Sequence, residues 1–240
     1  MDYSNAKEIF SKINLELSEK EFLDFTRYQK LLIEWNEKIN LTAITEDKDV
    51  WIKHFADSCT LIPILSKYSN NKNFSLIDVG TGAGFPSIPL KIINNDIDIT
   101  MLDSLNKRIN FLNEVIAELD FTNILAIHGR SEEVSHDTRL RERFDFATAR
   151  AVANLSTLLE YCLPFVKVNG YFICMKGSMI EKEESECKKA LKILGGEIIE
   201  KIKLNLPLIK DERNILVIKK IKNTPNEYSR KAGIPSRKPL

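Results

Sequence analysis

Three glycines at alternate positions follow an apolar segment that is typical of a buried β-strand. The segment covers residues 74–79, and the glycines are Gly80, Gly82 and Gly84. Glycine suits such a turn, because a side chain would block the tight reversal of the chain and hold the backbone away from a bound ligand. A dinucleotide-binding turn has the spacing Gly-x-Gly-x-x-Gly/Ala, and Phe85 stands at the last position here. The spacing favours S-adenosylmethionine as the cofactor; a turn without a ligand is the alternative.

A carboxylate at the end of the second expected strand strengthens the cofactor interpretation. The alternating segment 97–102 ends at Asp103, close to the offset of about 20 residues at which nucleotide-binding folds place an acid for the ribose hydroxyls. Asp103 or Ser104 could instead cap the helix that follows. We favour ribose binding, because the strand, the glycine turn and the second strand-end carboxylate occur in the required order.

Strand and helix patterns alternate through the middle of the chain. The expected strands are 74–79, 97–102, 124–127, 144–148 and 171–175, and the expected helices are 86–93, 105–119, 155–166 and 180–194. Segments 197–204 and 215–221 flank a polar turn and could form an antiparallel hairpin at the edge of the sheet. The predicted fold is therefore α/β and Rossmann-like, with about seven mostly parallel strands.

The first part of the chain has helical periodicity. Apolar residues recur at helical intervals through residues 18–40, and Ser18 with Glu21 fits a capping box. A second helix is expected at residues 50–65, where Pro63 strains its end. We therefore expect a helical appendage at 1–73 that ends in a polar linker at 68–73, a cofactor-binding domain at 74–222, and a basic tail at 223–240.

Composition narrows the class of protein. A chain of 240 residues has room for one large domain with an appendage, and 43% hydrophobic residues are ample for a core. The net charge of +1 means that a nucleic-acid partner must be bound by a local basic patch. The four cysteines lie far apart, which favours free buried thiols over disulfides or a zinc site. No apolar run reaches the length of a membrane span and no export signal is recognised, so we expect a cytoplasmic protein without a metal site.

The last residues of the chain are polar and basic. Residues 223–240 are rich in Asn, Pro, Ser, Gly and cations, and no core can be built from them. Such a segment is either a solvated tail or an arm that binds the phosphates of a nucleic acid.

With these features described, the chain resembles the ribosomal RNA small subunit methyltransferase G family, also called the glucose-inhibited division protein B family. The resemblance covers nearly the whole length and rests on the segments 31–44, Trp51 with 54–58, 78–86, 102–108, 130–133, 149–153, 176–177 and 228–235. Ser229 stands where the family often has proline. The resemblance implies a class I S-adenosylmethionine-dependent methyltransferase fold and methyl transfer to N7 of a guanine in 16S rRNA, near the decoding centre of the small ribosomal subunit.

By the same resemblance, Gly80, Phe85, the pair Ser131 and Glu132, and Arg150 fall at cofactor positions. The glycine turn is expected to accommodate the amino-acid end of the cofactor, and the Ser131–Glu132 pair is expected beside the adenine. Arg150 could meet the cofactor carboxylate, pair with a carboxylate such as Glu132, or contact an RNA phosphate. Phe85 could stack near the cofactor or belong to the core.

The implied reaction needs positioning rather than proton transfer. Guanine N7 has an exposed lone pair and no proton to remove, while the sulfonium methyl is already activated by its positive charge. The sequence has neither an Asn-Pro-Pro-Tyr loop for exocyclic amines nor a Pro-Cys nucleophile for attack on a pyrimidine. We therefore assign no catalytic acid or base.

The expected partner is 16S rRNA, as naked RNA or within the small subunit, and the protein is expected to be a monomer. Phosphate contacts need cations on the face where the strands end, and the candidates are Lys107, Arg108, Arg130, Lys176, Arg230, Arg237 and Lys238. Two alternatives remain open: a methyltransferase acting on another substrate, and an RNA-associated assembly factor that uses the cofactor only for stability. A nicotinamide-dependent dehydrogenase is disfavoured because Phe85 breaks its fingerprint.

Overall fold

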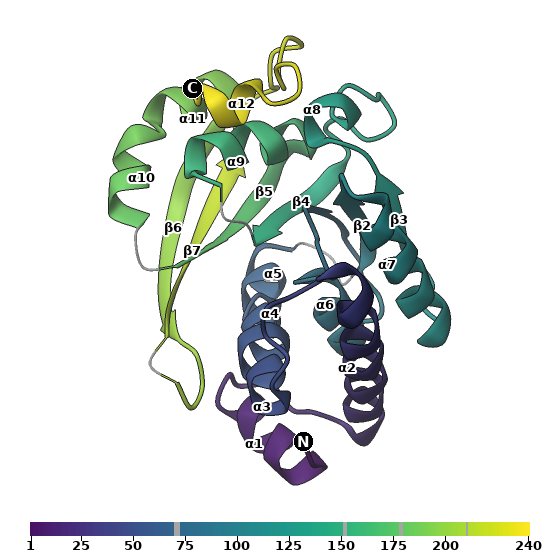
Figure 1. The fold of residues 1–240 in the computed structure, drawn as a ribbon. Helices are drawn as coiled ribbons and strands as arrows, with labels where there is room; N and C mark the ends of the chain where they lie inside the picture. The colour runs from purple at the N-terminus through teal and green to yellow at the C-terminus, as the bar shows by residue number, and fades with distance from the viewer. Residues whose placement is uncertain (70–72, 151–152, 178–179, 210) are drawn as a thin grey trace.

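A mostly parallel sheet lies at the centre of the computed structural model, which describes residues 1–69, 73–150, 153–177, 180–209 and 211–240 (Figure 1). Its seven strands have the order β3-β2-β1-β4-β5-β7-β6. They are β1 (Ser75–Val79), β2 (Asp98–Asp103), β3 (Ile124–His128), β4 (Phe144–Arg150), β5 (Val166–Lys176), β6 (Gly196–Asn205) and β7 (Glu212–Lys220). Only β7 runs antiparallel to its neighbours, β5 and β6. The predicted α/β sheet and its antiparallel hairpin at the edge are confirmed.

Helices cover both faces of the sheet. One face carries α1 (Tyr3–Ser11), α2 (Glu19–Ile39), α3 (Asp47–Val50), the π-helix η1 (Trp51–Ala56), α4 (Asp57–Cys59), α5 (Ile62–Tyr68), α6 (Ser87–Ile93) and α7 (Asn106–Glu118). The other carries α9 (Leu155–Cys162), the 3-10 helix η2 (Leu163–Phe165), α10 (Ile180–Glu186) and α11 (Lys188–Leu194), with the short helices α8 (Ser131–Val134) and α12 (Ile234–Arg237) beside α9. Successive strand residues point to opposite faces, so Leu76 belongs to one hydrophobic cluster and Ile77 to the other.

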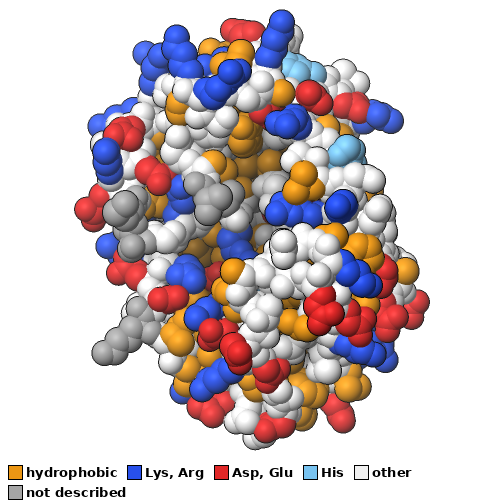
Figure 2. Space-filling model, in the orientation of Figure 1, with side chains coloured by type: hydrophobic (Ala, Val, Ile, Leu, Met, Phe, Trp, Pro, Cys, Tyr) orange, Lys and Arg blue, Asp and Glu red, His pale blue; other side chains and the backbone are white. Residues whose placement is uncertain are grey.

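The face that Figure 2 shows is hollowed in its middle, and Lys and Arg side chains lie around the hollow. No helix in the described parts of the chain is long and apolar enough to cross a membrane.

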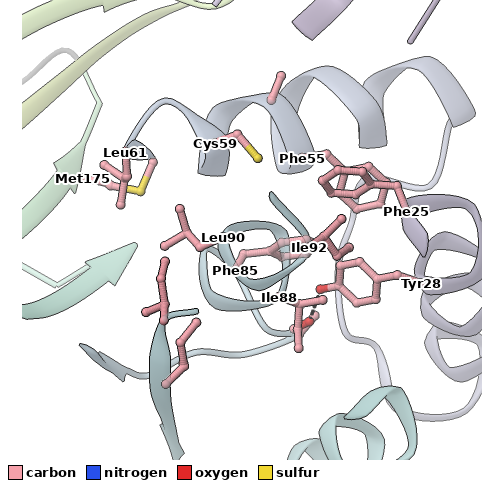
Figure 3. Packing of buried hydrophobic residues seen from close by; sticks show 14 of the residues in the cluster. Phe25, Tyr28, Phe55, Cys59, Leu61, Phe85, Ile88, Leu90, Ile92 and Met175 are labelled. Atoms are coloured by element: carbon pink, nitrogen blue, oxygen red, sulfur yellow. Dashed lines mark hydrogen bonds between the residues drawn. The ribbon is translucent and has the colours of Figure 1, made fainter. Parts of the chain in front are cut away.

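The N-terminal helices share one core with the sheet. The capping box predicted at Ser18 and Glu21 is present and starts α2. From this helix Phe25 and Tyr28 are fully buried against Phe55 of η1, with ring centroids 4.8 and 5.5 Å apart respectively, and Phe85 lies next to them (Figure 3). Fully burying one such side chain contributes about 1.5–3 kcal/mol. The N-terminal helices are therefore stabilised by the same cluster that supports the start of α6.

The structure divides three segments that were each expected to form a single helix. The segment 50–65 consists of η1, α4 and then α5, which restarts with Pro63 in its first turn because a proline needs no helical N–H there. The helix expected at 155–166 ends at Cys162; Pro164 lies in η2, and Val166 already begins β5. The helix expected at 180–194 is interrupted at Cys187, where ψ is −2°.

The basic tail is packed against the protein, so the alternative of a solvated tail is wrong, while phosphate binding by its exposed cations stays a prediction. Thr224, Ser229 and Pro235 are buried, and polar contacts hold this segment over α8 and α9. Composition misses this because hydrogen bonds and an ion pair to residues far away in the sequence hold the segment, and Tyr228 and Leu240 pack against the core. Of the linker expected at 68–73, residues 70–72 lie outside the described residues.

The glycine turn after β1 depends on the absence of a side chain at Gly84. Its φ is +92°, and a Cβ there would lie 2.6 Å from Cγ1 of Ile88 and 3.0 Å from Cδ2 of Leu112. Gly80 also has a positive φ of +75°, but its Cβ would meet no atom within 4 Å. An alanine at position 80 would therefore introduce backbone strain alone, whereas an alanine at position 84 would introduce both strain and steric overlap.

We expect Gly84→Ala to destabilise the protein by about 3 kcal/mol, because backbone strain and overpacking add. For a chain of this size that lowers the midpoint of thermal unfolding by roughly 6–12 °C. Gly80→Ala is the matched control and should lose only the strain contribution, about 1–2 kcal/mol. Differential scanning fluorimetry of the ligand-free proteins measures both, and equal losses would contradict the steric argument.

Candidate functional site

A cavity of about 210 Å³ opens where β1, β2 and β3 end. The strand order places β2 on one side of β1 and β4 on the other, so the chain leaves β1 at the point where the order of the sheet reverses. Open α/β sheets bind ligands in the crevice at this point. The cavity is lined by Val79, Gly80, Leu102, Asp103, Ser104, Gly129, Arg130, Ser131, Glu132, Ala153, Leu158 and Tyr161.

The glycine turn is tied to the end of β2. The amide of Gly80 donates to the carbonyl of Leu102 at 2.8 Å, and that of Gly82 donates to Oδ2 of Asp103 at 2.9 Å. Oδ1 of Asp103 accepts from the amide of Leu105, and Arg108 pairs with the same carboxylate at 3.2 Å. A carboxylate has about four acceptor positions, so Asp103 retains capacity for a ribose hydroxyl.

The residues of this turn fit an adenosyl cofactor. Positions 80 and 82 face open space where a Cβ would stand, so a ligand can come close to the backbone. The N-cap residue of α7 is Leu105, not Asp103 or Ser104. Asp103 is therefore not the N-cap of α7, and its contact with the ribose stays a prediction.

Ser131, Glu132 and Tyr161 form the opposite wall of the cavity. Ser131 and Glu132 begin α8 and are buried. The hydroxyl of Ser131 donates to the carbonyl of Tyr161 at 2.6 Å, and the Tyr161 hydroxyl lies 3.4 Å from Oε1 of Glu132. The sequence carried no signal for Tyr161, because it lies inside α9 and reaches the cavity only through the packing of that helix beside α8.

Asp78 is a buried carboxylate directly before the glycine turn that the sequence analysis did not single out. Oδ2 accepts from the hydroxyl of Ser87 at 2.9 Å, whereas Oδ1 has no hydrogen-bond partner in the described parts of the chain. Burial raises the pKa of Asp78 to about 7. The available signal was its place as the acidic residue in β1, two positions before the first glycine.

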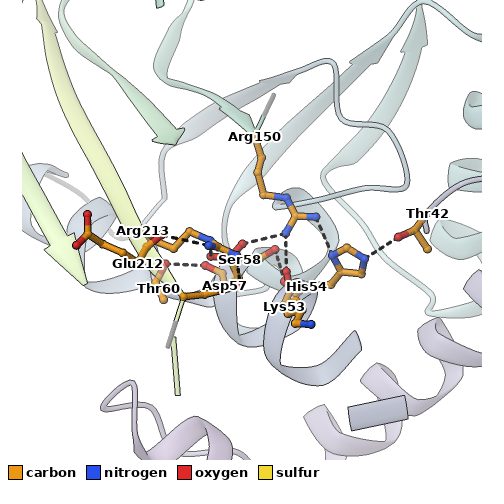
Figure 4. A network of polar contacts seen from close by, with 10 residues as sticks. Thr42, Lys53, His54, Asp57, Ser58, Thr60, Arg150, Glu212 and Arg213 are labelled. Carbon is orange, nitrogen blue, oxygen red and sulfur yellow. Dashed lines mark hydrogen bonds and ion pairs between the residues drawn. The ribbon is translucent and has the colours of Figure 1, made fainter. Parts of the chain in front are cut away.

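A second hollow of about 280 Å³ lies at the ends of β4 and β5, on the same edge of the sheet. Its centre is Asp57, which accepts from Nη1 of Arg150 and from Nε of Arg213, both at 3.2 Å (Figure 4). Asp57 is buried, and breaking a buried ion pair costs about 3–5 kcal/mol. These contacts join the N-terminal helices to β4 and β7, which are far away in the sequence.

His54 completes this network as a neutral side chain. Nη2 of Arg150 lies 3.0 Å from Nδ1 of His54, and Nε2 lies 2.8 Å from the hydroxyl of Thr42. A guanidinium only donates, so Nδ1 must carry the lone pair and Nε2 the hydrogen. Burial, followed by the charge of Arg150, lowers the pKa of His54 to about 3. The ring stacks on Phe85 at 4.3 Å, and the guanidinium carbon of Arg150 lies 4.7 Å from the centre of the Phe85 ring.

The residues expected to bind the cofactor therefore do not all lie at one cavity. Gly80, Asp103, Ser131 and Glu132 line the first cavity, and Gly82 binds Asp103 there. Phe85 and Gly84 pack toward the N-terminal helices. Arg150 lines the second hollow, where its partner is Asp57 rather than Glu132.

The cations expected to bind RNA also differ in their surroundings. Lys107, Arg130, Arg237 and Lys238 are exposed. Lys176 lines the second hollow and pairs with Glu183 at 2.7 Å. Arg108 pairs with Asp103, and Arg230 pairs with the buried Glu160 at 2.6 Å. The described residues contain no cluster of His, Cys, Asp or Glu that could hold a metal ion, and the four cysteines are free and buried as expected.

The strand order, the antiparallel β7 and a glycine turn with a strand-end carboxylate define the class I S-adenosylmethionine-dependent methyltransferase fold. Solved structures of this class are similar. TYW2 of M. jannaschii, solved in complex with AdoMet, superposes with a TM-score of 0.51 at 16% identity over 67% of this chain and 76% of that one. A SAM-dependent methyltransferase from Aquifex aeolicus superposes with a TM-score of 0.51 at 16% identity, over 72% of this chain and 93% of that one.

The family is more specific than the fold. The sequence model of the GidB family, rRNA small subunit methyltransferase G, matches residues 22–216. The chain is 51% identical to the Ribosomal RNA small subunit methyltransferase G of Alkaliphilus oremlandii over an alignment of 234 residues. This alignment covers 98% of this chain and 97% of that protein. The chain belongs to the rRNA small subunit methyltransferase G family, and its cofactor is S-adenosylmethionine.

We expect Asp78→Asn to stabilise the ligand-free protein in a pH-dependent way. The native pKa lies above the unfolded value of 3.8, so the native state binds more protons, and stability falls as the pH rises from about 4 to about 7. Asn removes this loss, which is on the order of 4 kcal/mol at most. Urea unfolding at several pH values should give a difference between variant and wild type that grows to pH 7 and then levels off. A difference independent of pH would contradict the assignment.

We also expect His54 to remain neutral well below its ordinary pKa, because its pKa is lowered to about 3. Long-range proton–nitrogen NMR spectra of ¹⁵N-histidine-labelled protein at pH 5 should show one signal set with Nε2 protonated and Nδ1 unprotonated. An imidazolium signal for His54 at that pH, assigned with the His54→Gln variant, would overturn this description of the network.

Proposed function

We propose that this chain transfers the methyl group of S-adenosylmethionine to N7 of a guanine in 16S rRNA, near the decoding centre of the small ribosomal subunit. The observation that carries the proposal is the cavity between Gly80, Asp103 and Glu132 in a chain of this family. The family supplies the class of substrate, and the cavity supplies a place for the methyl donor. In this proposal the protein acts as a monomer and meets the small subunit in the cytoplasm.

The residues around the cavity have distinct roles in this proposal. The turn with Gly80, Gly82 and Gly84 accommodates the amino-acid end of the cofactor, and Asp103 accepts hydrogen bonds from the ribose. Ser131 and Glu132 lie beside the adenine. The turn after β1, the end of β2 and the start of α8 all open into one cavity. One bound cofactor could therefore contact all three elements, which supports these assignments.

The chemistry requires little of the protein beyond positioning. The bound cofactor supplies a methyl group on a positively charged sulfur, and guanine N7 offers a lone pair without a proton. Holding two reactants in an attack geometry accounts for a large part of the barrier in such reactions. Arg150, fixed by Asp57 and His54 and stacked on Phe85, forms a rigid boundary of the second hollow that lies along the same edge. We place the target nucleotide there.

Cations around that hollow and along the neighbouring surface are the candidates for phosphate contacts. Lys53, Lys176 and Arg213 line it, and Lys and Arg side chains surround the hollow in Figure 2. Lys107 and Arg130 are exposed near the first cavity, and Arg237 and Lys238 are exposed near the C-terminus. Phosphate contacts of this kind orient an RNA without reading its sequence. Cations already paired with a carboxylate of the protein itself contribute less. This group comprises Arg108, Arg230, Lys53, Lys176 and Arg213.

The test is transfer of labelled methyl from S-adenosylmethionine to small subunits purified from a strain that lacks this protein. Wild type should label one 16S guanine at N7, located by chemical cleavage at the modified base. Asp103→Ala should raise the KM for the cofactor about 10- to 100-fold, since a buried carboxylate that accepts ribose hydroxyls contributes about 1.5–3 kcal/mol.

Lys107→Ala provides a comparison, because Lys107 is exposed and does not line the cavity. Its loss should raise the KM for the subunit and leave the KM for the cofactor unchanged. Label on another base or on protein would contradict the proposed substrate. Cofactor binding without any label would favour an assembly factor.

A further inference from the structure

The C-terminal segment 223–240, here named the C-terminal strap, runs over α8 and α9 next to the cofactor cavity (Figure 1). Arg141 holds its first part by donating to the carbonyls of Thr224, Pro225 and Tyr228 at 2.9, 3.1 and 2.8 Å respectively. Three carbonyl contacts from one guanidinium give this segment a defined path. They add to the packing of Tyr228 and Leu240 against the hydrophobic cluster on this side of the sheet.

The middle of the strap is held by a buried ion pair. Glu160 of α9 is completely buried, and its carboxylate accepts from the backbone amide, Nε and Nη2 of Arg230 at 2.8, 2.9 and 2.6 Å. The hydroxyl of Ser229 donates to the carbonyl of the same glutamate at 2.5 Å. Two parallel bonds between a guanidinium and a carboxylate give geometric specificity as well as energy. Arg230 is therefore committed to α9 and is not available as a free RNA-binding cation.

The strap then reaches the wall of the cavity. The amide of Gly233, whose φ is +77°, donates to Oε1 of Glu132 at 2.9 Å. The hydroxyl of Thr157 in α9 donates to the carbonyl of Pro235 at 3.0 Å on the far side of this contact. Besides Gly233, the partner of the Glu132 carboxylate among the described residues is the Tyr161 hydroxyl, at the longer distance of 3.4 Å. The strap thus makes the shorter of the contacts that orient Glu132.

We propose that the C-terminal strap is a structural part of the cofactor site, which fixes Glu132 for the adenine, and that the pair of Arg230 and Glu160 is its positioning element. This inference rests on the proposed function, which places Glu132 beside the adenine. A glutamate in the first turn of a four-residue helix has little support from its own element. Its orientation depends on the hydrogen bond from Gly233, and the position of Gly233 depends on Arg230 three residues earlier.

The experiment uses the full chain with Arg230→Ala and measures binding of S-adenosylhomocysteine and of 5′-methylthioadenosine by calorimetry. Both ligands carry the adenosine, but only the first carries the amino-acid end. Loss of one charge-assisted contact should weaken both by the same factor, about tenfold. At saturating cofactor, kcat on small subunits should stay near the wild-type value, because Arg230 touches neither reactant.

Lys231→Ala is the matched control. It removes the same charge from the neighbouring, exposed position and should leave both affinities unchanged. Arg230→Lys keeps the charge but loses the two parallel bonds, so it should give an intermediate loss of affinity for both ligands. This variant replaces Arg230→Ala in the experiment if Arg230→Ala unfolds.

Unchanged affinities together with a raised KM for the subunit would overturn the inference and make the strap an RNA-binding arm. A loss confined to S-adenosylhomocysteine would overturn the adenine assignment. If the wild type itself binds neither ligand, the proposed function fails, and the inference fails with it.

Discussion

The glycine turn after β1 is the constraint on which the rest of the structure depends, because it is fixed from both layers of the protein. On the side of the sheet, its amides donate to the end of β2 through Leu102 and Asp103. On the side of the helices, the buried hydroxyl of Tyr28 in α2 donates to the carbonyl of Ala83. The turn can therefore keep its open, side-chain-free surface toward the cavity without relaxing into a closed loop. The N-terminal helices are in this sense part of the cofactor site although none of their residues lines the first cavity.

Buried charge connects the remaining elements to this turn. Asp57 binds Arg150 and Arg213 together, so that one carboxylate in the N-terminal helices fixes the end of β4 and the start of β7. Arg150 then stacks on Phe85, which directly follows the glycines. On the other face Glu160 binds Arg230 and holds the C-terminal strap against α9. Each carboxylate is buried, and the low surrounding dielectric makes an unpaired partner costly, which favours a single arrangement.

The N-terminal helices and the C-terminal strap thus both contact the edge at which the parallel strands end. The N-terminal helices support the glycine turn and bound the second hollow. The C-terminal strap contacts Glu132 in the wall of the first cavity. The first cavity lies at the ends of β1 to β3. The second hollow lies at the ends of β4 and β5, where Arg150 lines it and packs on Phe85.

Local patterns in the sequence were sufficient to predict the strands, the capping box at Ser18, the glycine turn and the position of Asp103 at the end of β2. Periodicity, capping and turn geometry each act over only a few residues. Pattern alone missed the breaks at Cys162 and Cys187, and the packed strap, because long-range contacts decide them. The same holds for Asp78, whose pKa depends on complete burial, and for Arg150, for which the sequence left several partners open. Which carboxylate a cation meets is determined by the packing of elements far apart in the chain, since ion pairs have no sequence periodicity. The sequence by itself determined the class of fold and the cofactor, whereas only the tertiary structure decided that Asp57 binds Arg150 and that Gly233 reaches Glu132.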